Sequence, residues 1–494
     1  MRTLPSAVRT ALVTTIAAVG LTASLSAQSA SASDVEALRE QIRQLDQKLR
    51  VLERNSELNA EKVAADAKKL PVVAISDKGF TVTSPDKAFS IKLGALAQFD
   101  ARFFLDDDGV PNRDSFFLRR IRTPLSGTVG SIYDFNITPE LGANALGSTS
   151  STVGLIDAWF AARLTPGFGL KAGRFVSPVA LEPGANRHFI ESPFVNTLLP
   201  NRDIGIEAFG TIAGGPVDYR LGVFNGTRNN TQAFSSDEAD GDKTVAGRLT
   251  YTPFKKKEGA LSKLSLGLGG SVGNQRGVGT VGGANGLQNI STNGQQTLLS
   301  FRNATTGAGV IADGNQVRLS PTIEWYTGTP WSFVAEYAQE KQEYTRYTNN
   351  TVAPFTSVAA NSFTGTNSAW RATVGYVLTG EEATKAGVTP NSPFNWEGGT
   401  WGAFEVVARV SGINLANELF DPGAADGGGL SRTTNATGAI AYGAGVNWYL
   451  NRNVRLLFNV EKTEFEGGGT PNATNNNGAA SDELYLFTRL QLQF

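Results

Sequence analysis

Residues 484–494, LYLFTRLQLQF, decide the fold class of this chain. Apolar and polar residues alternate there with period two, so the two sets point to opposite faces of an extended strand. One face carries Leu484, Leu486, Leu490, Leu492 and Phe494, and the other carries Tyr485, Arg489, Gln491 and Gln493. The segment predicts a strand with one apolar and one polar face.

The same alternation recurs upstream, for example over residues 90–104. After Ile75 we count about sixteen such segments, joined alternately by short turns and long loops, which is the arrangement of outer-membrane barrels. A soluble sandwich also alternates, but the even count, the connection lengths and the terminal aromatic Phe494 together favour a membrane barrel. The expected fold class is all-β: a sixteen-stranded antiparallel transmembrane β-barrel. Phe494 is its expected membrane-insertion signal.

The composition excludes several other classes of protein. The 494 residues include no Cys and one His, with 44 Lys+Arg against 45 Asp+Glu. Disulfides, thiolate chemistry and His-pair metal sites are therefore excluded, and a net charge of −1 argues against a nucleic-acid partner. The lone His188 falls in a predicted external loop, where we expect a surface side chain. We expect no enzyme, no catalytic residue, no metal and no cofactor.

The N-terminal part divides into a signal peptide over 1–32, a coiled-coil helix over 34–70 and a linker over 71–88, before the barrel over 89–494. In the helix an apolar residue recurs with a strict seven-residue repeat, which predicts oligomerisation. The alternative is an amphipathic helix packed on its own domain. The seam residues are Val35, Leu38, Ile42, Leu45, Leu49 and Leu52.

Alternation also assigns side chains to the barrel interior. About eleven arginines are predicted to point inward by parity, among them Arg102, Arg120, Arg122 and Arg163. One interpretation is that they form neutralising pairs with inward acids. The other centres on the run 119–122, where three guanidinium groups, two of them sharing one face, create a positive patch suited to anions.

Several stretches resemble the phosphate-selective porin O/P family. They are the double-arginine strand at 116–122, the segments 173–178 and 199–205, the strand end at 223–226, the segment 378–382 with its long following turn, and residues 445–451. The resemblance covers the whole expected barrel.

This resemblance implies a trimeric outer-membrane channel for small anions, phosphate or polyphosphate among them, with a periplasmic N-terminal helix. It assigns Arg119 and Arg120 to the anion site and places Asp157 beside it. The implied partners are outer-membrane lipid, anionic solutes, two further copies of the chain and the barrel assembly machinery. The alternative is a general-diffusion, sugar or organic-acid porin whose N-terminal helix tethers the envelope.

Overall fold

The computed structural model describes residues 32–67, 69–105, 114–142, 154–181, 188–226, 241–277, 286–301, 309–349, 357–420, 428–432, 435–467 and 482–494. The predicted signal peptide, apart from Ala32, lies outside the described residues. The chain forms two compact units, residues 1–70 and 71–494. Each unit is described by itself.

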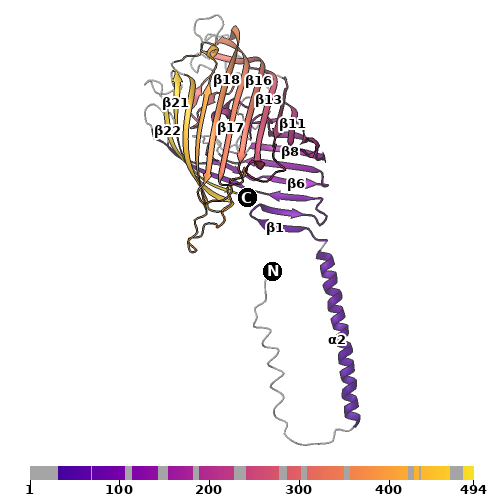
Figure 1. Ribbon diagram of the computed structural model, residues 1–494. Helices are drawn as coiled ribbons and strands as arrows, with labels where there is room; N and C mark the ends of the chain where they lie inside the picture. The colour runs from indigo at the N-terminus through magenta and orange to yellow at the C-terminus, as the bar shows by residue number, and fades with distance from the viewer. Residues whose placement is uncertain are drawn as a thin grey trace. The chain divides into compact units, whose positions relative to one another are not determined.

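The first unit contains the helix α2, Ala32–Ala67 (Figure 1). Its sequence has neither Gly nor Pro, and Asp34 in the first turn complements the helix dipole. Ion pairs one turn apart, such as Arg50–Asp46 at 3.1 Å, support it. The six seam residues from Val35 to Leu52 are 44–67 % exposed. None of the described helices is both long enough and apolar enough to span a membrane.

The second unit is a closed antiparallel barrel of sixteen strands, as predicted, because β22 pairs with β4 from Tyr485↔Phe104 to Gln493↔Leu96. Two strands are interrupted: β3 continues as β4, and β5 continues as β6 past Pro124, which has no N–H for the ladder. The bounds are β3 Ser90–Leu93, β4 Leu96–Phe104, β5 Ser115–Arg122, β6 Leu125–Val129, β7 Tyr133–Glu140, β8 Gly154–Thr165, β9 Phe168–Val176, β10 Arg202–Thr211, β11 Val217–Phe224, β12 Thr244–Tyr251, β13 Leu264–Arg276, β16 Gly309–Tyr326, β17 Trp331–Asn349, β18 Ser357–Val377, β19 Ala403–Asn414, β20 Ala436–Tyr449, β21 Val454–Gly467 and β22 Asp482–Gln493.

The segment expected to be a linker carries a hairpin instead. Strands β1, Val72–Ser76, and β2, Gly79–Thr83, pair with each other, and β2 pairs with β3. At the hairpin turn, Asp77 forms an ion pair of 2.7 Å with Arg452 in the turn before β21. Residues 72–83 therefore extend the sheet beyond the barrel rather than forming an unstructured connection.

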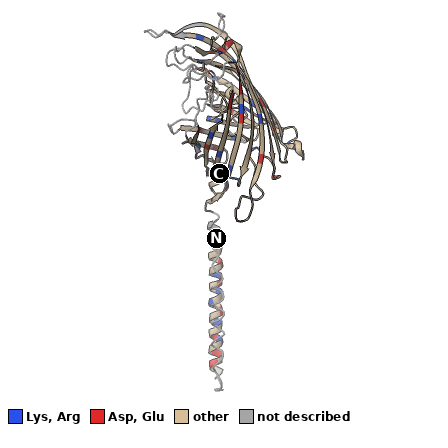
Figure 2. Ribbon diagram, turned by 90° about the vertical axis from the view of Figure 1, so that its left-hand side faces the viewer, with Lys and Arg blue, Asp and Glu red and all other residues tan. Residues whose placement is uncertain are grey.

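The predicted alternation is confirmed in the strands. In β22, Arg489 is buried while Leu490 is 45 % exposed. On the outer face of β4 and β5, Phe99 stacks on Phe116 with ring centroids 6.1 Å apart. Exposed apolar side chains suit lipid, and closure of the sheet satisfies the backbone groups that lipid cannot. In Figure 2 most of the barrel ribbon is uncharged, whereas charged residues follow α2 along its length.

Three neighbouring strands are much longer than the sequence pattern predicts. β16, β17 and β18 contain 18, 19 and 21 residues, although about 9–11 residues cross a bilayer. Parts of the expected loops 274–315 and 341–368 are therefore paired strand. The long strands dominate one side of the barrel in Figure 1. The expected long turn around 381–400 is present between β18 and β19.

Two of the described connections fold into the barrel. The first joins β9 to β10, contains the short helix η1, Phe194–Thr197, and is buried at nearly every described position. The second, residues 286–301, carries the two-stranded sheet of β14, Ile290–Ser291, and β15, Thr297–Leu299. The other short helices are η2 Ile212–Gly214, η3 Ala260–Lys263 and η4 Asn417–Leu419. We call the described residues 177–181 and 188–201 the inner loop.

Candidate functional site

An irregularity in β5 turns three arginines toward the interior. Arg120 pairs with Gln98, but Leu118 pairs with the next residue, Phe99, so Arg119 is the extra residue of a β-bulge. Arg119 and Arg120 are each 5 % exposed. The prediction that only two arginines of this run share a face is therefore wrong, because regular alternation cannot anticipate a bulge.

Glu191 of the inner loop lies among these arginines. Its carboxylate contacts Arg102, accepts a 3.1 Å hydrogen bond from Nε of Arg119, and lies 3.6 Å from Nη2 of Arg489. Burial raises the pKa of Glu191, but Arg119, Arg102 and Arg489 outweigh it and leave this pKa well below its ordinary value. The loop is thus fixed to β4, β5 and β22 by a charged carboxylate.

Main-chain contacts hold the same loop to β19, β21 and β22, on the side of the barrel opposite β9 and β10, between which the loop lies. Arg409 donates to the carbonyl oxygen of Glu191 at 2.8 Å. Arg489 donates to the carbonyl oxygen of Ile190 at 2.8 Å, and the Ile190 N–H donates to Asn459 Oδ1 at 2.7 Å. The inner loop therefore crosses the lumen and narrows it.

His188 occupies a different place from the predicted surface position. It is 4 % exposed, and its Nε2 lies 3.0 Å from Ser332 Oγ and 3.8 Å from Glu405 Oε1. The surface prediction is wrong because the loop folds inward. A serine and a carboxylate on the same ring nitrogen do not form a Ser-His-acid relay, in which the acid holds the other nitrogen.

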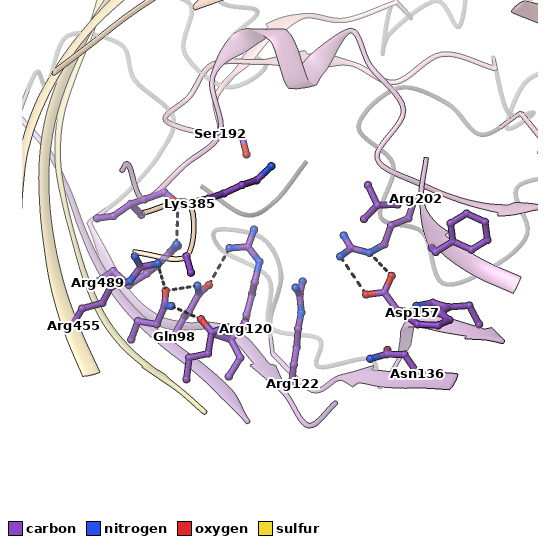
Figure 3. Close-up of a pocket in the computed structure, with 18 of the residues that line it drawn as sticks. Gln98, Arg120, Arg122, Asn136, Asp157, Ser192, Arg202, Lys385, Arg455 and Arg489 are labelled. Atoms are coloured by element: carbon purple, nitrogen blue, oxygen red, sulfur yellow. Dashed lines mark hydrogen bonds and ion pairs between the residues drawn. The ribbon is translucent and has the colours of Figure 1, made fainter. Parts of the chain in front are cut away.

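A cavity of about 870 Å³ adjoins this constriction. Figure 3 shows Arg120 and Arg122 between the group of Gln98, Arg455 and Arg489 and the pair Arg202–Asp157. Among the described residues, one acid, Asp157, lines the cavity, against eight basic residues: Arg120, Arg122, Lys171, Arg202, Arg220, Lys385, Arg455 and Arg489.

Most of these cations are compensated by carboxylates. The ion pairs are Arg122–Glu140 at 2.6 Å, Arg202–Asp157 at 2.9 Å, Arg220–Glu207 at 2.8 Å, Lys385–Glu324 at 3.1 Å and Arg489–Asp100 at 2.6 Å. The expectation of neutralising pairs is therefore confirmed for this part of the wall. Such pairs fix side chains but leave little charge for a solute.

Arg120 differs from them. Within the described part of the chain its guanidinium has one hydrogen-bond partner, the amide oxygen of Gln98 at 2.9 Å, and its buried Nε has none. An amide orients the guanidinium without neutralising it. Arg120 therefore presents a positive charge and free donors toward a water-accessible cavity, which suits an anion.

The other predicted site residues lie in several places. Asp157 lines the cavity and holds Arg202. Arg102 is 0 % exposed and contacts protein groups, so it supports the site from behind. Arg163 lies apart, near the turn after β8, and pairs with Asp134. Phe494 closes the barrel seam through 3.0 Å backbone hydrogen bonds with Ala95.

Sequence reasoning missed several residues of the site. Lys171 and Lys385 line the cavity, and Glu191 anchors the inner loop. Lys171 could have been found by extending the alternation along β9. Glu191 and Lys385 lie on connections, where no periodic pattern indicates direction. Among the described residues, no group of three or more His, Asp or Glu side chains is arranged to hold a metal ion.

Comparison with known proteins identifies the family of this barrel. Residues 89–494 match the family "Phosphate-selective porin O and P", so the chain belongs to that family and is an outer-membrane porin. Porin O of Pseudomonas aeruginosa is 27 % identical over 452 residues, which cover 86 % of this chain and 92 % of that protein.

Solved structures with a similar fold include an anion-selective porin from Comamonas acidovorans, at 11 % identity and a TM-score of 0.46, covering 82 % of this chain and 100 % of that one. OmpT of Vibrio cholerae has 10 % identity and a TM-score of 0.49, covering 82 % of this chain and 98 % of that one.

Proposed function

We propose that this porin passes small anions by passive diffusion and that Arg120 is the principal anion-binding residue of its constriction. The observation that supports this most directly is the uncompensated Arg120 guanidinium beside a cavity lined by eight basic residues and one acid. Conduction needs binding strong enough to attract the ion and weak enough to release it. A cation held by an amide, beside cations that are neutralised by carboxylates, meets both needs.

Planar-bilayer recording tests this proposal. Across a chloride gradient, the wild-type channel is expected to give an anion-selective reversal potential. Arg120→Gln is expected to lower the anion-to-cation permeability ratio, and Arg120→Gln with Arg122→Gln to lower it further. Arg163→Gln is the matched control, because it removes the same charge at a position paired with Asp134 outside the cavity. Equal ratios in Arg120→Gln and wild type would overturn the role of Arg120.

Phosphate is the solute class that the family name suggests, and the guanidinium fork of Arg120 fits its oxygens. Inorganic phosphate added to a chloride solution is then expected to reduce chloride current in the wild type at lower concentration than in Arg120→Gln. Weak selectivity without such a block would support the alternative, a general-diffusion or organic-acid and sugar porin. Transport along a gradient includes no catalytic step and no cofactor.

We further propose that three copies assemble, with α2 in the periplasm forming a parallel coiled coil. The exposed seam carries the argument, because most of the stability of a helix comes from packing its apolar face, and the six apolar seam residues of α2 are exposed. The chain contains no Cys, so Leu45→Cys on the seam is expected to cross-link between copies. Gln47→Cys, outside the seam, is the control. Equal cross-linking of both variants would contradict the coiled coil.

A tethering role of the same helix, in addition to transport, predicts an envelope defect when residues 34–70 are deleted. Normal envelope integrity in that strain would contradict it. Assembly into the outer membrane brings the barrel into contact with lipid and with the barrel assembly machinery. Phe494 stays a prediction as the signal that this machinery reads.

A further inference from the structure

Four inward-facing residues form a row across the strands that close the barrel. Arg120 of β5 is paired directly with Gln98 of β4. Gln98 is paired with Gln491 of β22, and Gln491 is paired with Arg455 of β21. All four line the cavity. We call them the seam row, because an arginine, two glutamines and an arginine follow one another across the seam between β4 and β22.

The β-bulge at Arg119 determines which residue faces Gln98. Leu118 pairs with Phe99, so without the extra residue Arg119 would be paired with Gln98. With the bulge, Arg120 takes that position, and its Nη1 donates a 2.9 Å hydrogen bond to Oε1 of Gln98 (Figure 3). The contact between guanidinium and amide is therefore set by strand pairing.

The hydrogen bonds along the seam row run in one direction. A guanidinium only donates, whereas an amide has one oxygen that accepts and one NH2 group that donates. Nε2 of Gln98 donates to Oε1 of Gln491 at 2.9 Å, and the same oxygen accepts from Nη2 of Arg455 at 3.2 Å. The NH2 group of Gln491 donates to Oε1 of Gln493 at 3.1 Å. Because both amide oxygens are held by donors, the two buried glutamines have one orientation each.

Carboxylates hold the neighbouring arginines. Two residues along β4 from Gln98, Asp100 is paired with Arg489 of β22 and accepts hydrogen bonds from it at 2.6 and 2.7 Å. Two residues along β5 from Arg120, Arg122 is held by Glu140 at 2.6 Å. Arg120 instead faces an amide, which has a dipole but no net charge. The partner of Arg120 on β4 therefore decides whether its charge is cancelled.

We propose that Gln98 is the residue that determines selectivity at Arg120: its amide orients the guanidinium and leaves the positive charge to a small inorganic anion. Gln491 is a positioning residue, because it fixes the Gln98 amide from the neighbouring strand. This inference rests on the proposed anion-porin function and identifies what keeps its binding residue effective. A carboxylate in place of the Gln98 amide would make Arg120 one more neutral pair of the wall.

Bilayer recordings of Gln98→Glu test this inference. The variant keeps the length of the side chain and places a carboxylate beside an unchanged Arg120. The anion-to-cation permeability ratio is expected to fall roughly one-and-a-half- to fivefold, as in Arg120→Gln. Gln275→Glu is the matched control, because it adds the same charge at another buried glutamine, on β13 and outside the cavity. The control is expected to lower the ratio much less.

Gln98→Leu separates orientation from charge. It leaves Arg120 charged but without the amide, so the permeability ratio should fall less than in Gln98→Glu, while the phosphate concentration that halves chloride current should rise. Gln491→Leu should raise that concentration to a smaller extent, since Arg120 keeps its direct partner. A purely structural role of the glutamines would lower the yield of folded barrel, measured by the heat-dependent gel shift, and leave both quantities unchanged in the channels that fold.

The possible failures are distinguishable. A wild-type ratio in Gln98→Glu, with Arg120→Gln still lowering it, would overturn the role of Gln98 alone. If Gln98→Glu does not fold, an unchanged phosphate block in Gln98→Leu would overturn that role. A wild-type channel without anion selectivity would overturn the proposed function itself.

Discussion

Arg102 connects the two segments that fold into the barrel. One guanidinium nitrogen contacts Glu191 of the inner loop, and another donates a 2.9 Å hydrogen bond to Oε1 of Gln295 in the segment 286–301. The side chain is 0 % exposed and is also held by Asp100 at 2.9 Å. One side chain of the barrel wall thus fixes both of these inward-folded segments.

Arg102→Gln is expected to raise single-channel conductance and to admit larger neutral polymers, because both segments lose a common anchor. Removing one partner of a buried ion pair costs about 3–5 kcal/mol, so the unfolding temperature should fall as well. Conductance and polymer exclusion measure the first effect. The heat-dependent gel shift of folded barrels identifies samples that still fold. Wild-type conductance in a folded Arg102→Gln channel would contradict the anchoring role.

Asp157→Asn is expected to strengthen anion binding. Asp157 is the one acid among the described residues that line the cavity, and it accepts hydrogen bonds from Arg202 at 2.9 and 3.3 Å. Its neutral amide replacement leaves Arg202 uncompensated. Partly exposed ion pairs are worth about 0.2–1 kcal/mol, so the phosphate concentration that halves chloride current should drop roughly one-and-a-half to fivefold. Asp134→Asn, which frees Arg163 away from the cavity, should leave that concentration unchanged.

The stability contribution of Glu191 should depend on pH in a defined direction. Its pKa in the folded barrel lies below the ordinary carboxyl value of about 4.3. The unfolded chain therefore takes up the proton first, and the contribution is complete above that value and lost as pH falls toward the lower, folded-state pKa. The difference in unfolding temperature between wild type and Glu191→Gln should be constant from about pH 7 to 5 and shrink at lower pH.

A difference that instead grew on acidification would mean that Glu191 is protonated in the folded barrel. That result would contradict the observed contacts, in which the Glu191 carboxylate lies among the guanidinium groups of Arg102, Arg119 and Arg489.

Period-two alternation is sufficient to predict the strands, since Arg489 and Leu490 differ by one residue and face opposite sides. It also places Arg120 inside. Period-two alternation cannot predict the bulge at Arg119, because the extra residue depends on the pairing with Gln98 and Phe99 of a neighbouring strand. The alternation also does not predict the extra length of β16–β18. The parts of these strands that extend beyond the lipid-facing segments pair with each other, and their sequence has no lipid-facing pattern.

The inward course of the inner loop was beyond sequence reasoning. Nothing in the sequence around His188 and Glu191 distinguishes a solvated loop from one that crosses a lumen. The direction is set by partners far apart in the chain, Arg102, Arg409 and Arg489. Charge counting along the strands found most of the cations but could not tell which were neutralised. Arg122 is neutralised by Glu140, whereas Arg120 is held by the amide of Gln98. This difference arises from the fold and has no counterpart in the sequence pattern.

Gly173→Ala is expected to prevent or strongly destabilise folding of the barrel. Gly173 has a φ of +125°, and a Cβ atom there would lie 2.2 Å from the carbonyl oxygen of Ala158 on the neighbouring strand. The backbone at Ala158 cannot move aside without breaking the β8–β9 ladder, and a positive φ is unfavourable for residues with a side chain.

Gly328→Ala is the matched control: φ is +75°, but nothing lies within 4 Å of the added Cβ. The control should cost only the backbone strain of about 1–2 kcal/mol and should still yield the heat-shifted folded band. Equal yields of folded protein from both variants would show that the contact with Ala158 is relieved by a shift of the strands.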